Sequence, residues 1–512
     1  MATIDALSVA ASGIANVNRN IGLLSHNIAN AGTPGYLREV HNQRAATGGG
    51  LAMGVASGPA TRDVDAALQA RLLTENAVAE AANLTAQSLA PLEAAHGKTG
   101  AGGDIPALLA DLESGFSTLA SDPASATQQN AVVGQAGALT AQIRNVADTV
   151  DTLRQNAQDD VVARVAALNT ALGRIGELNA QIVRLRALGS STADLENARD
   201  AAAADASAQV ELRAMVRPNG EMVLATTSGL QLPTLPGGPQ LSVQAAQLGP
   251  SAAYPASVPG VMLGGIDVTV QFSDGRTGTG GIGAALLLRD TTLPGFQGEL
   301  DEFAETLARR FEEQGVRLFS DPAGALPAAV GVPRQSAYLR FANTIQVNPA
   351  ISANPAFVRD GTGAVAAAPG GPTAFTPNPP GGPAGFTTLI TRVLSYALGD
   401  QVAAGVPQPA PNLSGMGPTG ALNSPMNAPG PIAGFATALV ARQTVASGDA
   451  ASAATAAGDV QTALTQNMSD RSGVNLDTEL SSMVVLQNAY AANAKVIGTL
   501  QQMWSALLQA VQ

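Results

Sequence analysis

The chain has 512 residues, of which 46% are hydrophobic, 13% charged and 3% aromatic, a length that exceeds what one hydrophobic core usually serves. The net charge of −12, with no sustained basic patch, argues against a surface that binds nucleic acid or an anionic membrane. Cysteine is absent, which excludes disulfides, thiolate zinc sites and cysteine nucleophiles.

The N-terminal stretch predicts a helix over residues 3–31 that carries a coiled-coil seam. Two apolar rows recur at every seventh position, one formed by Leu7, Ile14, Ile21 and Ile28, the other by Ala10, Val17 and Leu24. Apolar spacing of three and four residues makes a narrow stripe on a helix, as in coiled coils. Pro34 ends the helix, because proline cannot continue the hydrogen-bonding pattern.

The next part of the chain predicts helices. Residues 36–62 contain several glycines and are interpreted as an irregular link. Helices are then predicted over residues 63–95, 104–120, 126–188 and 194–207. The third of these keeps its apolar spacing without a proline, which is typical of a helical bundle or hairpin.

The periodicity changes after residue 208. Residues 211–216 and 221–226 predict a β-hairpin, and residues 260–272 predict a half-buried strand, so 208–288 is expected to be β-rich. Further helices are predicted over residues 300–314, 386–398 and 433–468. The stretch 361–433 is dense in Pro, Gly and Ala, and most of it is expected to be flexible loop.

The last forty residues predict a second seam. One row is Leu476, Met483, Tyr490, Ile497, Trp504 and Val511, and the other is Leu486, Asn493, Leu500 and Leu507. We expect the two seams to pair with each other and then with neighbouring subunits, although each could be an ordinary core helix. Asn493 is the polar member, and either it fixes register and partner number or it faces the backbone of a neighbouring subunit.

These elements predict an α+β multidomain protein, mostly helical, with terminal coiled-coil helices, a helical-bundle middle and an inserted β-rich domain. The expected division is a terminal tube domain (1–40 and 470–512), a mostly helical middle (41–207 and 289–469), and the β-rich outer domain (208–288). The flexible stretch 361–433 lies within the middle domain.

Few residues suggest a catalytic or ligand-binding site. Gly278–Gly283 fits G-x-G-x-x-G, but five residues separate it from the predicted strand and no repeated βαβ pattern surrounds it. A glycine-rich loop is therefore favoured over a dinucleotide site. Asp63 and Asp65 lack the rest of a calcium-loop pattern and are expected to open the following helix.

The three histidines, His26, His41 and His96, do not predict a metal site. Without cysteine, a zinc site would need all three of them or help from carboxylates. His26 is expected to cap or pack at the end of its helix. We expect no catalytic residue, no cofactor and no bound metal.

The sequence motifs at both ends resemble those of the axial proteins of the bacterial flagellum, which are the rod, hook and hook-associated proteins. The N-terminal motif is Asn27–Arg38 with its Thr-Pro-Gly-Tyr turn, and the C-terminal signature is Ser472–Asp477 followed by Gln487–Ile497. Gly32 and Leu37 depart from the commonest form. In the middle, the stretches Leu178–Ile182, Asn197–Asp200 and Leu288–Phe296 are similar to hook-associated proteins of the hook–filament junction.

This resemblance implies a structural, self-assembling protein that joins hook to filament, and not an enzyme. Its implied partners are further copies of itself, the hook protein, the next hook-associated junction protein and an export chaperone, with no nucleic acid and no membrane. The implied location is extracellular, after export without a cleaved signal peptide. A hook or distal-rod protein is an alternative, and a dinucleotide-binding enzyme is a remote one.

The resemblance also implies an assembly interface made of the two seams. Its predicted residues are Leu7, Ile14, Val17, Ile21, Leu24, Ile28, Leu476, Met483, Leu486, Tyr490, Asn493, Ile497, Leu500, Trp504 and Leu507.

Overall fold

The computed structural model describes residues 2–33, 35–48, 51–97, 102–235, 237–273, 275, 278–328, 331 and 333–510, and the side chains of these except at 2–5, 48, 51, 52, 507 and 510. Long α-helices dominate, accompanied by small antiparallel sheets. The chain forms two compact units, one from Met1–Ala79, Ala166–Leu241 and Ala456–Gln512, the other from Glu80–Val165 and Ser242–Thr455. Among the described helices, none is long and apolar enough to cross a membrane.

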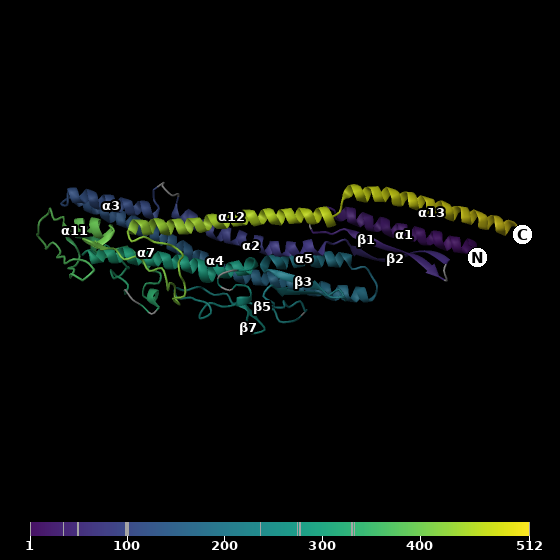
Figure 1. Cartoon of the computed structure of the whole chain (residues 1–512), viewed down its shortest axis with the longest axis horizontal. Helices are drawn as coiled ribbons and strands as arrows, with labels where there is room; N and C mark the ends of the chain where they lie inside the picture. The colour runs from purple at the N-terminus through teal and green to yellow at the C-terminus, as the bar shows by residue number, and fades with distance from the viewer. Residues whose placement is uncertain are drawn as a thin grey trace. The chain divides into compact units, whose positions relative to one another are not determined.

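The first unit contains both terminal helices. Helix α1 (Ala2–Asn30) lies beside α13 (Leu476–Ala510), and the two run antiparallel (Figure 1). Strands β1 (Glu39–Gly48) and β2 (Leu51–Arg62) form an antiparallel hairpin that packs on α1.

The remaining helices and strands of the first unit form a second group, beside the pair of terminal helices and the β1–β2 hairpin. It contains α5 (Ala193–Gln209), the hairpin of β3 (Leu212–Val216) and β4 (Met222–Thr226), and parts of α2 (Ala66–His96), α4 (Ala126–Ala187) and α12 (Ile432–Ser472). Buried polar side chains hold the hairpin: Arg199 donates to Gly220 O at 2.6 Å, and Asn179 exchanges two hydrogen bonds with the Met222 backbone.

The second unit is a helical core with aromatic packing. Its main helices besides parts of α2, α4 and α12 are α3 (Ile105–Ser121), α6 (Gly280–Leu287) and α7 (Leu293–Glu313), with a π-helical turn η2 (Leu288–Thr292) between the last two. The ring centroids of Phe303 and Phe435 lie 5.4 Å apart in an edge-to-face contact, an arrangement that stabilises a core beyond its buried area.

The remaining elements are short. They are β5 (Leu241–Ser242), β6 (Met262–Leu263), β7 (Ile266–Asp267), η1 (Thr269–Gln271), β8 (Phe319–Ser320), η3 (Arg334–Ala337), α8 (Phe341–Thr344), β9 (Gln346–Val347), α9 (Pro349–Ala353), α10 (Phe357–Asp360), α11 (Thr388–Arg392), η4 (Val393–Ala397), β10 (Gln401–Ala403) and β11 (Val406–Pro407). The stretch 208–288 thus holds five of the described strands but divides between the two units at Leu241, unlike the single inserted domain predicted from sequence.

The predicted long helices and the hairpin at 211–226 are confirmed, but two other predictions are wrong. Within 36–62, Glu39–Gly48 and Leu51–Arg62 form the paired strands β1 and β2 instead of an irregular link. Residues 260–272 hold two strands of two residues each instead of one half-buried strand. Gly264 and Gly265, with φ of 58° and 86°, make the tight turn between them, which only glycine adopts readily.

The stretch 361–433 is also different from the flexible loop predicted. It has little regular structure, but outside the predicted helix at 386–398 it buries Phe375, Val402, Ala403 and Met416 and therefore contributes to the core. Its later part also satisfies buried groups: Gly430 O accepts from Arg310 at 2.5 Å, and Gly417 N donates to Gln335 at 2.6 Å. This stretch can be ordered without regular secondary structure, because side chains from elsewhere in the unit bond to its backbone polar groups.

Deletion of residues 402–431 should therefore destabilise the second unit. The deletion would remove the fully buried Met416 and leave Arg310 and Gln335 without these partners. Each unsatisfied buried group costs about 1–3 kcal/mol, so we expect a loss of roughly 3 kcal/mol or more in the free energy of unfolding. Urea unfolding of both proteins measures it, with a shortened turn at the exposed residues 366–370 as control. An unchanged midpoint after the 402–431 deletion would mean that the stretch carries no packing role.

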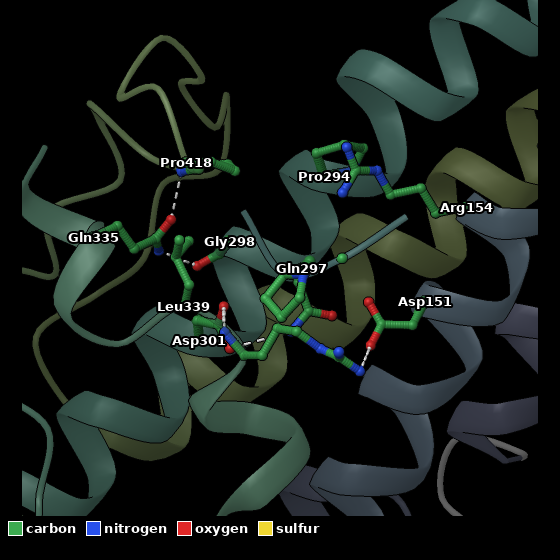
Figure 2. A pocket seen from close by; sticks show the side chains of 13 residues that line it. Asp151, Arg154, Pro294, Gln297, Gly298, Asp301, Gln335, Leu339 and Pro418 are labelled. Atoms are coloured by element: carbon green, nitrogen blue, oxygen red, sulfur yellow. Dashed lines mark hydrogen bonds and ion pairs between the residues drawn. The ribbon is translucent and has the colours of Figure 1, made fainter. Parts of the chain in front are cut away.

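A buried carboxyl group lies inside the second unit, beside a cavity of about 20 Å³ (Figure 2). Asp301 is fully buried and accepts hydrogen bonds from Arg340 N at 2.7 Å and Ala342 N at 3.0 Å. Burial raises the pKa of Asp301 to about 7, although these donors oppose the shift. Asp151, which also lines the cavity, forms an ion pair with Arg340.

The stability of the second unit should depend on pH through Asp301. Because the folded state holds this proton more tightly than the unfolded state, the contribution is greatest below about pH 4 and is lost as pH rises to about 7. Relative to Asp301→Asn, the wild-type free energy of unfolding should fall by roughly 1.4 kcal/mol per pH unit across that window. Urea unfolding from pH 4 to 8 measures this difference, and parallel curves for the two proteins would contradict it.

Candidate assembly interface

The two terminal helices meet along the seams that the sequence predicts. At the centre of the contact, a Cβ atom on Gly13 would lie 3.1 Å from Asn493 Oδ1, so glycine permits the close approach of α1 and α13. Asn493 is half-buried there, and its Nδ2 donates to Ala489 O of its own helix at 3.0 Å. A polar side chain at a seam position opposite glycine favours one register of the two helices.

The two rows of α1 differ in burial. Ala10, Val17 and Leu24 are buried within the chain, whereas Ile14, Ile21 and Ile28 are half-buried. Leu7 is exposed. Part of the predicted interface on α1 is therefore already used inside one copy of the protein.

The rows of α13 separate less cleanly by burial. Leu486, Asn493 and Leu500 are half-buried, as are Met483 and Ile497. Leu476, Tyr490 and Trp504, from the other predicted row, are exposed by 42–50%. The side chain of Leu507 and the whole of Val511 lie outside the described residues.

The outer side of α13 is an exposed apolar face. We define it by the exposed side chains Leu476, Leu480, Val484, Tyr490, Val496, Met503, Trp504 and Leu508. The helix has 35 residues, and Asp477, Glu479 and Lys495 are its charged ones. Large apolar side chains that are exposed together on one helix mark an interaction surface.

The β1–β2 hairpin covers another side of α1. Asn16 is buried beneath it and bonds to Gln43, His41 and Ser57, at 2.6, 2.9 and 3.0 Å. Burial lowers the pKa of His41, and the charge of Arg19 lowers it further.

Tyr36, the last residue of the Thr-Pro-Gly-Tyr motif, belongs to a buried polar network at the end of α1, whereas Pro34 lies outside the described residues. Asn27 is 1% exposed, its Nδ2 donates to Glu39 O at 3.0 Å, and its Oδ1 accepts from Glu39 N at 3.1 Å. The Tyr36 hydroxyl donates to the same Oδ1 at 2.9 Å. Burial is the largest cause that raises the pKa of Tyr36, so its hydroxyl stays protonated and remains a donor.

The network links the N-terminal motif to the C-terminal signature. Arg38 Nε lies 2.5 Å from Glu479 Oε1, and the Glu479 side chain is fully buried. The Arg38 backbone N–H donates to Ser472 O at 2.8 Å, and Asn27 Nδ2 also approaches Glu479 Oε2 at 3.4 Å. The two ends of the chain thus form one site although more than 400 residues separate them.

Sequence reasoning missed Glu479, although a signal was available. The row of Leu486, Asn493 and Leu500 reaches Glu479 when it is extended back by seven residues. A carboxylate at a seam position requires a cationic partner, and Arg38 in the N-terminal motif supplies it. A groove of about 330 Å³ lies between α1, β1 and α13, and Leu24, Glu479 and Val485 are among its lining residues.

Motifs elsewhere have structural explanations. At Gly278, a Cβ would lie 2.2 Å from Gly283 O, and at Gly283 it would lie 2.4 Å from Phe272 O. These glycines therefore permit the chain to pack closely on itself. Asp65 accepts from Leu68 N at 3.1 Å, which lowers the pKa of Asp65 and confirms that this motif opens the following helix.

Two regions of the chain match models of known protein families. Residues 92–324 match the family model of the flagellar hook-associated protein FlgK helical domain, and residues 465–510 match that of the flagellar basal body rod FlgEFG protein C-terminal. No curated protein matches the chain. Among solved structures, the flagellar hook junction protein FlgK from Burkholderia pseudomallei is 21% identical, with a TM-score of 0.41, over 51% of this chain and 47% of that chain. The chain thus aligns with about half the length of that protein.

A C-terminal helix of the rod and hook type, paired with an N-terminal helix, defines a flagellar axial protein. The helical domain in its middle identifies the group more closely. Over residues 92–324 and 465–510 the chain thus matches family models of flagellar proteins, and the longer match is to the hook-associated protein FlgK helical domain.

Proposed function

We propose that this chain is a structural, self-assembling component of the bacterial flagellum that joins the hook to the filament, and that it catalyses no reaction. The observation that carries the proposal is the exposed apolar face of α13. One side of this helix is occupied by α1, while Val484 and Trp504 remain 57% and 50% exposed.

Neighbouring copies of the chain are the first partners that we propose for this face. Burial of apolar surface stabilises association by about 25 cal/mol per Å², and several large side chains are available on one helix. The same seams also fit the terminal helices of other axial proteins. We therefore propose the hook protein on one side and the next hook-associated junction protein on the other, with a chaperone that covers the face before export.

The middle of the chain favours the hook–filament junction over a hook or distal-rod protein. The C-terminal helix belongs to a family description shared with the rod proteins, whereas residues 92–324 match a helical domain of the hook-associated class. Buried polar groups support this region: Arg289 donates to Gln158 at 2.7 Å and to Pro259 O at 3.0 Å. As part of the flagellum, the protein would act outside the cell after export from the cytoplasm.

Deletion of the gene for this chain tests the proposal. We expect cells with complete hooks and no filaments, and we expect filament protein in the medium because nothing retains it at the hook. Expression of the chain in the same cells should restore filaments. Cells that lack hooks as well would indicate a rod or hook protein, and cells with normal filaments would contradict both functions.

A further inference from the structure

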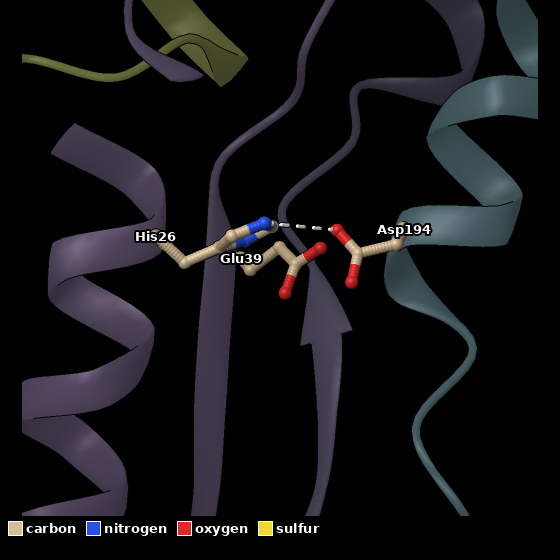
Figure 3. Close-up of side chains that lie close together, drawn as sticks. All are labelled: His26, Glu39 and Asp194. Carbon is tan, nitrogen blue, oxygen red and sulfur yellow. Dashed lines mark ion pairs between the residues drawn. The ribbon is translucent and has the colours of Figure 1, made fainter. Parts of the chain in front are cut away.

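Three potential ligand side chains from three separate elements of the first unit converge at one point (Figure 3). His26 comes from α1, Glu39 from the start of β1, and Asp194 from the first turn of α5. One ligand atom from each lies within 4.8 Å of the others, and His26 Nε2 lies 3.5 Å from Asp194 Oδ1. This convergence depends on the fold, because the residues are far apart in sequence.

The hydrogen-bond network fixes which nitrogen of His26 faces the cluster. Asn27 is oriented by its two bonds to the Glu39 backbone, so its Oδ1 is the acceptor for the Tyr36 hydroxyl. The Tyr36 oxygen lies 3.2 Å from His26 Nδ1 and must accept that proton, since its own proton is already donated. A neutral His26 therefore presents the lone pair of Nε2 to the carboxylates, as metal-binding histidines do.

Glu39 supplies the second observation. It is 4% exposed, its carboxyl group interacts with that of Asp194, and its Oε1 makes no geometric hydrogen bond to another described residue. Figure 3 shows this carboxylate between His26 and Asp194. A buried carboxylate oxygen without a partner is costly, and it lies here beside a second carboxylate and a nitrogen lone pair. A cation among the three would satisfy all of them.

We propose that His26, Glu39 and Asp194 bind a divalent transition-metal ion, for which Zn²⁺ is the best-matched probe. One imidazole nitrogen and two carboxylate oxygens suit zinc and its neighbours, whereas Ca²⁺ requires six to eight oxygen ligands. Asp194 has a side chain that is 67% exposed, so water can complete the coordination and the ion can enter from solvent.

Such an ion would fasten the end of α1 to β1 and to α5 within the first unit. It would stabilise the same Asn27–Tyr36 network that positions Arg38 against Glu479. The site is independent of the proposed function, because it concerns the single folded chain and does not require assembly.

Calorimetric titration of the untagged, chelator-treated full chain with Zn²⁺ tests the proposal. We expect one site whose affinity falls by more than about tenfold in Asp194→Asn and in Glu39→Gln. Neither change should unfold the protein. Asp194 is exposed, and the hydrogen bonds between Asn27 and Glu39 involve the backbone of Glu39 and not its carboxyl group. Asp205→Asn, on an exposed position of the same helix, should bind Zn²⁺ like the wild type. Ca²⁺ at equal concentration should not bind.

A spectroscopic measurement identifies the ligand directly. The chain has three histidines, so their imidazole nitrogens can be resolved by ¹⁵N NMR. Zn²⁺ should shift Nε2 of His26 and leave His41 and His96 unchanged. The proposal is overturned if the wild type binds no Zn²⁺, if Asp194→Asn binds it equally well, or if both His26 nitrogens carry protons in the presence of Zn²⁺. The last result would mean that a proton on His26, and not a metal ion, faces the two carboxyl groups.

Discussion

Val484→Asp should abolish incorporation of the protein into the flagellum while it leaves the folded chain intact. Val484 is 57% exposed on the outer face of α13, so in a single copy the carboxylate would remain in water. In an assembly that covers this face, an unpaired carboxylate would be desolvated at a cost of several kcal/mol. A cost of about 3 kcal/mol weakens a subunit contact by roughly 100-fold.

Filament counts by electron microscopy, together with the melting temperature of the purified protein, measure this result. The matched control is Val445→Asp, since Val445 is also on a helix and is 56% exposed. We expect normal filaments in the control and none with Val484→Asp, at equal melting temperatures. Normal filaments in both strains would mean that the outer face of α13 is not covered in the flagellum.

Arg38→Ala should release α13 from the first unit. Glu479 is fully buried, and Arg38 is its cationic partner at 2.5 Å. Removal of one member of a buried pair leaves an uncompensated charge, which costs about 3–5 kcal/mol. Hydrogen exchange should therefore show loss of protection in α13, and the free energy of unfolding of the first unit should fall by that amount.

Two further variants give this prediction its control. Arg217→Ala breaks a surface pair with Glu221, where the Arg217 side chain is 54% exposed, and should cost less than about 1 kcal/mol. Glu479→Leu combined with Arg38→Ala removes the buried charge and should recover much of the loss. Equal effects of Arg38→Ala and Arg217→Ala would show that the buried pair does not hold the two ends together.

The helices could be predicted because their signal is local. The seven-residue rows located both terminal helices, and proline-free apolar spacing gave the 62-residue span of α4 to within a residue at either end. The hairpin at Leu212–Thr226 was also predicted, since its turn residues lie beside alternating apolar positions. These features depend on neighbours in sequence.

The β1–β2 hairpin could not be predicted for the opposite reason. Its strands are rich in small and polar residues, and their support includes hydrogen bonds between Asn16 on α1 and His41, Gln43 and Ser57. The stretch 361–433 was misjudged in the same way, because its polar groups are satisfied by helices distant in sequence.

Sequence reasoning could predict only part of the candidate assembly interface. The seam residues were found from their period, whereas the burial that separates Val17 and Leu24 from Tyr490 and Trp504 depends on how α1, α13 and the hairpin pack. That the exposed members contact neighbouring subunits is a prediction from the sequence, whereas the proposed contact of His26 with a metal is one that the sequence did not indicate.

Cross-linking in assembled flagella tests the central claim most directly. The chain has no cysteine, so a single introduced cysteine reports on one position alone. A variant with Val484→Cys, treated with a short bis-maleimide, should give cross-linked species in isolated flagella and only monomer in dilute solution. Val445→Cys serves as the control for accidental contacts. A Val484→Cys protein that is present in the flagellum yet stays monomeric would contradict the claim that the outer face of α13 is an assembly surface.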